Sequence, residues 1–221
     1  MKITITSVGS RGDVQPYVAL GKGLAAAGHQ VTLAVDPLFQ SFVEEHGLTF
    51  ARLTADPMKA LRRADLMIFS NVAALVGVHV GAALDVPMIS SALQPIVPTK
   101  AYSYSAGMHV PEKMPFRGTL NKLTYKISYR FLYRLFFDMI NQGREELLGL
   151  PPLPWRMFAN LDLSHYPILH GFSRHVVPFP PDYDQFQIFT GYWFLEQDKD
   201  YSPPETLRRF LAEEPRPVYV G

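Results

Sequence analysis

One carboxylate, Asp13, lies in a segment (residues 8–16) where a nucleotide-binding α/β fold usually keeps only glycines. Residues 2–8 alternate β-branched and polar side chains, which predicts a strand, and residues 16–27 have a helical period. We expect Asp13 in the loop beneath the helix start, because Pro16 suits a first helical turn. A carboxylate built into a helix N-terminus repels phosphate. Proton abstraction is therefore the chemistry it could do, and the competing interpretation is an aspartate that only caps a helix or turn.

No second group of reactive side chains has the spacing of a site. His165, His170 and His175 recur every five residues, which fits neither a helix face nor a strand face, so we expect no metal site. The chain has no cysteine, which excludes disulfides and thiolate chemistry and fits a reducing compartment. Because Met1 runs straight into the first predicted strand, we expect no signal peptide and a cytoplasmic protein.

The first ninety residues alternate between strand and helix patterns. They predict an α/β fold: a doubly wound, Rossmann-like, mostly parallel sheet with helices on both faces, which binds ligands at the carboxyl ends of its strands. Gly28 and Gly47 fall where helix ends need a left-handed residue. The predicted strands are 2–8, 30–35, 48–53, 66–70 and 87–91, and the predicted helices are 16–27, 38–46 and 72–84, with a short helix over 57–63.

The second half of the chain begins with a proline-rich loop at 92–117, of the kind that forms binding surface beside a sheet. A long helix at 118–149, broken near Gly143, and strands at 167–171 and 186–191 follow. Ser202 is the expected N-cap of a last helix, with Pro203 at its first position, Glu205 completing a capping box and an end near Glu213. Residues 216–221 read as the start of a further strand.

Charge and hydropathy argue against two functions, nucleic-acid binding and membrane spanning. The net charge of +1 and the absence of nucleic-acid-binding motifs argue against DNA or RNA. Residues 66–84 contain no Asp, Glu, Lys or Arg, but Ser, Asn, Gly and His interrupt them, so we interpret them as a buried strand and helix rather than a membrane span.

A basic row recurs at four-residue spacing within the long predicted helix, formed by Lys122, Lys126, Arg130 and Arg134. Such a row drifts by roughly 40° per repeat, so it winds around a helix instead of forming a flat face. One interpretation is a solvated basic edge. The other is a patch that rests on the inner face of an anionic membrane, where a lipid acceptor would be found.

Several motifs resemble the glycosyltransferases of the two-domain GT-B fold, in particular the bacterial antibiotic and sterol glucosyltransferase-like branch. They are Gly9-Ser10-Arg11-Gly12-Asp13-Val14-Gln15-Pro16, Gly77-Val78-His79-Val80, Gln94-Pro95 with Pro98-Thr99, Thr190-Gly191-Tyr192-Trp193-Phe194 and the closing Pro217-Val218-Tyr219-Val220-Gly221. Their order spans nearly the whole chain. The resemblance implies that residues 1–215 are an amino-terminal acceptor-binding domain and that 216–221 lead toward a donor-binding domain.

The resemblance also implies an activity and a set of roles. The enzyme would be an inverting, metal-independent glycosyltransferase without a cofactor, which uses a nucleotide-sugar as substrate. Asp13 matches the general base, while Gly9, Ser10 and Gly12 match the loop that approaches the donor phosphates. We assign His79, Gln94, Tyr102 and Met114 to the binding of an apolar acceptor such as a sterol, lipid, polyketide or flavonoid. For His79 a buried structural histidine is the alternative, and for Tyr102 and Met114 the alternative is a side chain that only anchors the loop.

Two departures from the family pattern stand in the sequence. Many eukaryotic relatives carry His at the position of Asp13, oriented by an Asp at the position of Ser70-Asn71, and neither is present here. The connection 54–64 is also shorter than the family's usual segment.

Two other function classes remain open. A dinucleotide-dependent oxidoreductase would use Gly9, Gly12 and Asp36, but the glycine spacing is not Gly-x-Gly-x-x-Gly and Asp13 would crowd the pyrophosphate. A non-enzymatic module would bind a small apolar molecule or a partner chain that supplies the catalytic half.

Overall fold

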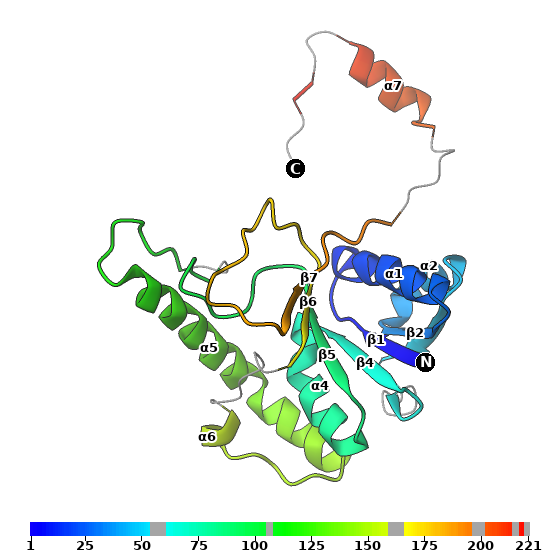
Figure 1. The fold of residues 1–221 in the computed structure, drawn as a ribbon. Helices are drawn as coiled ribbons and strands as arrows, with labels where there is room; N and C mark the ends of the chain where they lie inside the picture. Colours follow the sequence, from blue (N-terminus) through cyan, green and yellow to red (C-terminus); the bar gives the residue numbers. More distant parts are fainter. Residues whose placement is uncertain (54–60, 105–107, 159–165, 196–201, 214–216, 219–221) are drawn as a thin grey trace.

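The computed structural model describes residues 1–53, 61–104, 108–158, 166–195, 202–213 and 217–218 of the chain (Figure 1). Its strands are β1 (Lys2–Thr6), β2 (Gln30–Val35), β3 (Thr49–Arg52), β4 (Leu66–Ser70), β5 (Met88–Ala92), β6 (Ile168–His170) and β7 (Gln187–Phe189). Its helices are α1 (Arg11–Ala26), η1 (Pro37–Phe39), α2 (Gln40–Glu45), α4 (Asn71–Leu84), α5 (Arg117–Glu146), α6 (Trp155–Phe158) and α7 (Glu205–Ala212).

The seven strands form one sheet in which every neighbouring pair is parallel, in the order β3-β2-β1-β4-β5-β6-β7. The predicted doubly wound sheet is therefore confirmed. Chain order reverses between β1 and β4, where Thr6 pairs with Phe69. In such sheets the crevice at the carboxyl ends beside this reversal is the usual ligand site.

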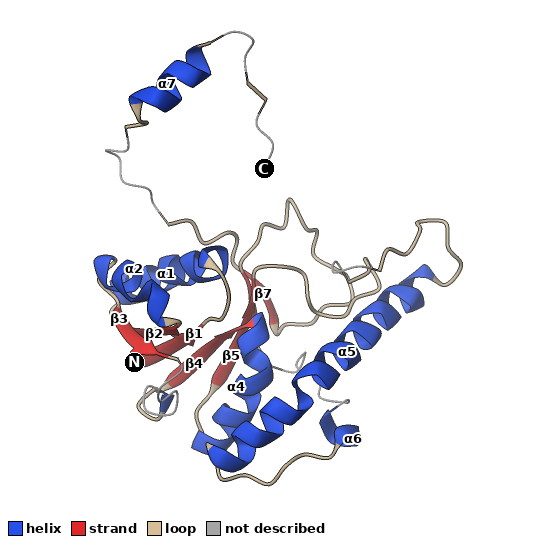
Figure 2. Cartoon of the chain, turned by 180° about the vertical axis from the view of Figure 1, so that it is seen from behind, coloured by secondary structure: helices blue, strands red, loops and turns tan. Residues whose placement is uncertain are grey.

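Helices cover both faces of the sheet because side chains on each strand alternate between the faces (Figure 2). Ile68 belongs to the core shared with α1 and α2, whereas its neighbours Met67 and Phe69 belong to the core shared with α4. Gly77 lets α4 approach closely, since a Cβ there would come within 2.6 Å of the Phe69 ring. The apolar stretch 66–84 is thus a buried strand and its following helix, as predicted, and no described helix is long and apolar enough to cross a bilayer.

Some predicted boundaries differ from the structure. Helix α1 begins at Arg11, so Pro16 lies inside the helix rather than in its first turn. Helix α5 continues through Gly143 without a break. The expected N-cap Ser202 is wrong: α7 begins after Pro204, and the Ser202 hydroxyl instead accepts a hydrogen bond from Arg208. Gly28 and Gly47 do have positive φ angles, of 90° and 74°.

Helix α7 lies apart from the sheet in both views (Figures 1 and 2). None of its residues is buried. The predicted helix over 57–63 lies mostly outside the described residues, as does most of the expected strand at 216–221.

Candidate functional site

The loop between β1 and α1 is built around Asp13, which occupies the third position of α1 rather than the loop below it. Its Oδ2 accepts hydrogen bonds from the backbone N–H of Ser10 at 2.7 Å and from the Ser10 hydroxyl at 2.9 Å. Ser10 is the N-cap, so the two residues form a reciprocal capping arrangement. The carboxylate remains exposed to solvent, and the adjacent helix N-terminus favours its negative charge.

Gly9 makes this arrangement possible. Its φ is 139°, a conformation that side chains with a Cβ rarely adopt. A Cβ added there would lie 2.3 Å from the Asp13 Oδ2. The Ser7 hydroxyl holds the other side of the turn by donating to the backbone oxygen of Asp13 at 2.9 Å. The predicted residues Gly9, Ser10, Gly12 and Asp13 therefore lie together in one turn.

An apolar cavity of about 460 Å³ lies beside this loop, at the carboxyl edge where strand order reverses. The sheet side supplies Thr6, Val8, Leu53 and Phe69. Helix α4 supplies Ala73, Val76, His79 and Val80. The carboxyl-terminal half of α5 supplies Phe136, Met139, Ile140, Gly143 and Arg144. The volume lies in the range of small-molecule sites, and the lining is that of a site for an apolar ligand.

The sheet contributes a polar atom to this apolar wall. Strand alternation turns Ile3 and Ile5 toward α1, so Thr6 faces the cavity side of the sheet. Its hydroxyl is buried and has no hydrogen-bond partner among the described residues. A ligand with a hydroxyl or carbonyl group could satisfy it.

His79 and Arg144 meet on the helical wall of the cavity. The Arg144 Nη1 donates to the His79 Nδ1 across 3.0 Å, and the Arg144 Nε donates to the Pro151 carbonyl at 3.0 Å. Burial and the nearby guanidinium lower the pKa of His79 to about 4. His79 is therefore neutral near pH 7, and because its Nδ1 accepts, the ring proton lies on Nε2.

The other predicted acceptor residues do not line this cavity. Gln94 is exposed in the loop after β5, and Met114 is 46% exposed before α5. Tyr102 is half-buried, with its hydroxyl 3.5 Å from the Tyr183 hydroxyl. The structure thus brings His79, but not these three residues, into the apolar cavity.

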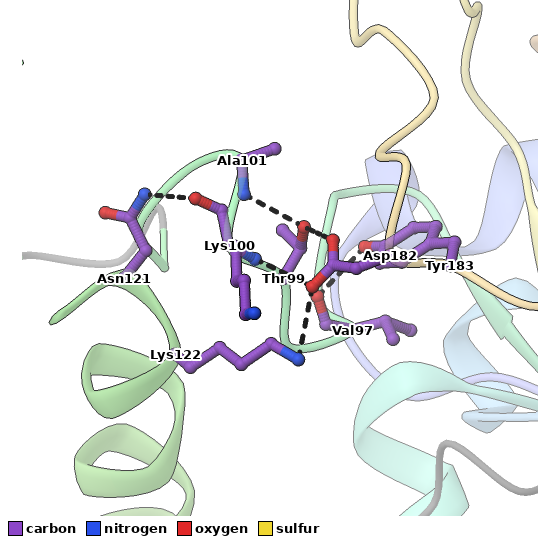
Figure 3. A network of polar contacts seen from close by, with 8 residues as sticks. All are labelled: Val97, Thr99, Lys100, Ala101, Asn121, Lys122, Asp182 and Tyr183. Atoms are coloured by element: carbon purple, nitrogen blue, oxygen red, sulfur yellow. Dashed lines mark hydrogen bonds and ion pairs between the residues drawn. The ribbon is translucent and has the colours of Figure 1, made fainter. Parts of the chain in front are cut away.

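A polar network ties the proline-rich loop to α5 and to the segment before β7 (Figure 3). The Asp182 carboxylate accepts from the Thr99 hydroxyl at 2.5 Å, from the Lys100 N–H at 3.0 Å and from the Lys122 ammonium at 3.1 Å. Partial burial opposes ionisation of Asp182, but these hydrogen bonds and the Lys122 charge outweigh it and lower its pKa. Asn121 completes the link by donating to the Lys100 carbonyl at 2.9 Å.

The predicted basic row on α5 has unequal members. Lys122 is paired with Asp182, and the Arg134 guanidinium lies over the Trp155 ring at 5.8 Å. Lys126 and Arg130 are exposed, and the large apolar side chains beside them are exposed as well. These apolar residues are Leu123 (45% exposed), Ile127 (48%) and Phe131 (64%).

Sequence reasoning missed most residues of the cavity wall, including the polar groups of Thr6 and Arg144 and the ring of Phe136. Thr6 ends a strand, and Phe136 and Arg144 lie on a helix whose position over α4 no local pattern reveals. A signal for the Asp13 position was present, since Ser10-x-x-Asp13 is the spacing of a capping box. The alternative dinucleotide residue, Asp36, caps η1 by accepting from the Leu38 N–H at 2.9 Å.

The doubly wound sheet, with a cavity where the strand order reverses, defines a Rossmann-like α/β domain. The family model of the glycosyltransferase family 28 N-terminal domain matches residues 3–127, more than half of the chain. The chain therefore belongs to glycosyltransferase family 28. Membership of this family argues against the alternative of a dinucleotide-dependent oxidoreductase.

Individual glycosyltransferases are similar to the whole chain. A sterol 3-beta-glucosyltransferase of Sclerotinia sclerotiorum is 31% identical over 261 residues, covering 100% of this chain and 18% of the relative. One of Cryptococcus neoformans var. neoformans serotype D is 32% identical over 267 residues, covering 100% and 16%. The chain thus spans less than a fifth of the length of these relatives.

Solved structures confirm the GT-B type of fold. The calicheamicin glycosyltransferase CalG4 superimposes with a TM-score of 0.57 at 17% identity, covering 92% of this chain and 54% of that chain. The glycotransferase of kitacinnamycin gives a TM-score of 0.57 at 21% identity, covering 92% and 55%.

Proposed function

We propose that this chain is the acceptor-binding domain of an inverting glycosyltransferase. The acceptor is an apolar molecule with a hydroxyl group, and a second domain binds the nucleotide-sugar. The observation that carries the proposal is the position of the apolar cavity. Its wall includes Val8, which directly precedes the Gly9–Asp13 turn, so an acceptor bound in the cavity can extend a hydroxyl toward the Asp13 carboxylate.

In the proposed reaction Asp13 takes the proton of the acceptor hydroxyl while the hydroxyl oxygen attacks the anomeric carbon of the sugar. The bond from that carbon to the nucleoside diphosphate breaks, and the diphosphate leaves with the bonding electrons. A base must lie within hydrogen-bond reach of the proton that it removes. Asp13 meets the accessibility requirement because it is exposed and its described hydrogen bonds all engage Oδ2, which leaves Oδ1 for the acceptor.

The Ser10 and Gly12 positions support the donor side of the proposal. Ser10 is the N-cap of α1, and its N–H and hydroxyl already donate to Asp13. Gly12 lies in the first turn, where backbone N–H groups lack intrahelical partners and attract anions. We assign the donor diphosphate to the space facing this turn. The capping by Ser10 keeps the Asp13 carboxylate turned onto its own helix end, which offsets its repulsion of the phosphates.

The relatives support a rigid apolar skeleton for the acceptor. They are sterol 3-beta-glucosyltransferases, and a sterol is a rigid apolar molecule that carries a hydroxyl at one end. The walls of the cavity, formed by Phe69, Val80, Phe136 and Ile140, suit such a skeleton.

Substitution of Asp13 tests the assignment in a two-domain protein that carries this chain as its amino-terminal domain. Asp13→Asn should lower turnover by about a hundredfold or more and leave the affinity for the nucleotide-sugar nearly unchanged. Asp36→Asn is the matched control, because it removes a carboxylate that caps η1 outside the cavity and should leave turnover nearly unchanged. An Asp13→Asn enzyme that keeps more than about half of the turnover would remove Asp13 from the mechanism.

We also propose that α5 brings the domain to an anionic membrane, with a narrower contact than the whole basic row. Lys126 and Arg130 are its cations, and Leu123, Ile127 and Phe131 are its apolar side chains. On an α-helix these five positions span about 140° of the circumference, so they share one side. Exposed apolar residues flanked by cations fit contact with a lipid surface better than they fit a purely solvated edge.

A further inference from the structure

The Arg144 guanidinium is a buried cation in a cavity that is otherwise almost entirely apolar. Arg144 is 8% exposed and lies in the last turn of α5. Its two described hydrogen bonds go to neutral groups, the Pro151 carbonyl and the His79 ring nitrogen. Within the described parts of the chain, no acidic side chain contacts it or lines the cavity.

Such a cation is costly without a counter-ion. Removing a charge from water costs several kcal/mol unless it is paired and hydrogen-bonded. Burial lowers the pKa of Arg144, but arginine stays protonated in proteins, so neutralisation does not relieve the cost. The negative end of the α5 dipole and the Pro151 carbonyl offset part of it. The remaining N–H groups of the guanidinium can serve an anion in the cavity.

The position of His79 and Arg144 in the cavity sets the distance between an anion bound by Arg144 and Asp13. Because β4 and β5 are parallel, α4 must run from the carboxyl edge of the sheet back toward the amino edge. His79 follows Ala73 by six residues, so it lies on the order of 9 Å farther from the carboxyl edge. The cation therefore lies deep along α4, whereas the Asp13 turn lies at the edge beside Val8.

We propose that the cavity takes an acceptor whose rigid apolar skeleton carries a hydroxyl at one end and a carboxylate at the other, with the carboxylate bound by Arg144. This inference rests on the proposed function, since it names the class of acceptor for the same cavity. The hydroxyl points to Asp13 for glycosylation. The guanidinium binds the carboxylate by two parallel N–H···O hydrogen bonds, which also fix which end of the skeleton enters first.

His79 contributes to the orientation of the guanidinium. Because His79 stays neutral, it accepts one N–H from Arg144 without competing for the anion as a second cation would. The site should therefore favour a hydroxy acid over a neutral sterol, because the far end of a neutral sterol is apolar and would leave the guanidinium without a partner.

A triterpene series differing at one functional group tests the proposal on the chain itself. Betulin, betulinic acid and methyl betulinate share one skeleton and the same ring hydroxyl, and bear at the far position an alcohol, a carboxylic acid and its neutral ester. Equilibrium dialysis at pH 8, where the acid is ionised, should show betulinic acid binding at least about tenfold more tightly than betulin, because hydrogen bonds to charged groups exceed neutral ones. Methyl betulinate should bind like betulin.

Variants of Arg144 assign the preference to its side chain. Arg144→Met should bring the affinities for acid and alcohol to within about twofold while leaving betulin binding intact, which also reports that the cavity is folded. Arg144→Lys should keep part of the preference for the acid. Arg134→Met removes an exposed cation from the same helix and should change nothing.

The outcomes separate this inference from the proposed function. Equal binding of acid and alcohol by the unaltered chain overturns the carboxylate proposal and leaves the apolar acceptor site standing. Tight binding of the methyl ester shows that the site recognises a carbonyl instead of an anion, and also overturns it. Failure of all three compounds to bind overturns both proposals. A preference for the acid that Arg144→Met leaves unchanged overturns the assignment of the carboxylate to Arg144.

Discussion

Asp13 combines a structural and a proposed chemical role in one carboxylate. The capping hydrogen bonds from Ser10 fix its position, and Gly9 provides the space beneath it. A base that is held by its own helix end is oriented before the substrate arrives, so less ordering remains for the reaction step. The two interpretations drawn from the sequence, cap and base, are therefore compatible: the cap is observed and the base stays a prediction.

His79 gives a prediction for the pH dependence of folding. Its pKa is about 4 in the folded chain, against an ordinary value of 6.5. Between these pH values the unfolded chain binds more protons, so the free energy of unfolding decreases as pH falls from 6.5 toward 4, by about 3 kcal/mol for this one group. Above pH 6.5 His79 contributes no pH dependence. Urea denaturation at pH 8, 6 and 5 measures the slope.

The matched variant for this measurement is His79→Gln. Its amide oxygen can accept the hydrogen bond from Arg144 in place of the His79 Nδ1, but the side chain does not titrate. Burial also lowers the pKa of His170, so acid should still weaken the variant, but by less than the unaltered chain. Identical slopes for the two proteins between pH 6.5 and 5 would contradict the environment assigned to His79.

At the scale of elements, α5 has different tasks along its length. Its beginning is fixed by the network around Asp182, its middle exposes Ile127 and Phe131, and its end supplies Ile140 and Arg144 to the cavity. If the middle contacts a membrane, the end of the same helix carries one wall of the cavity to that surface. An acceptor could then enter from the lipid without crossing bulk water.

Flotation with vesicles tests this contact. The chain should float with vesicles that contain anionic lipid, and Lys126→Gln with Arg130→Gln should weaken binding by about 2 kcal/mol, near 1 kcal/mol for each cation. Phe131→Ser should weaken binding to the same vesicles through lost apolar contact. Lys22→Gln with Arg52→Gln removes two exposed charges elsewhere and serves as the control. Absence of flotation at low salt would mean that this side of α5 is a solvated surface.

The elements also show what the sequence could predict. Strand alternation and helical period located β1, β2, β4 and α4 to within two residues, because each signal is local. The start of α1 was predicted too late, since Pro16 was given more weight than the Ser10 cap. The cavity was beyond such reasoning: His79 and Arg144 are far apart in sequence and meet only because the carboxyl-terminal end of α5 reaches α4. Tyr102 and Met114 had the right chemistry for an apolar site but lie on the loop held by Asp182.

On the scale of the whole molecule, the segment after β7 packs against α1, the first helix of the sheet domain. Trp193 lies against Tyr17 of α1 with ring centroids 5.5 Å apart, and its indole N–H donates to the Thr190 hydroxyl at 2.9 Å. Leu195 joins the same core. By contrast, α7 has no buried residue. The segment 192–195 therefore belongs to the sheet domain in terms of packing, and α7 contributes little to it.

Two truncations distinguish these contributions. A chain that ends after Leu195 should keep its free energy of unfolding to within about 1 kcal/mol, since α7 buries no side chain. A chain that ends after Gly191 also loses Trp193 and Leu195 and should be destabilised by about 1–3 kcal/mol, the scale of burying such side chains in part. Urea denaturation of both proteins gives the difference. Equal stability of the two would show that Trp193 adds nothing to the core.

The contact between Trp193 and Tyr17 has a consequence for synthesis on the ribosome. The strands β1 to β5 and the helices between them can assemble as soon as they emerge, because their pairings join neighbouring parts of the chain. Tyr17, however, must wait for Trp193, which follows far later in the sequence, so the α1 face stays incomplete while the intervening residues are translated. Long-range closure of this kind slows folding and prolongs exposure of apolar surface. A newly made chain would be most vulnerable to aggregation and chaperone capture in that interval.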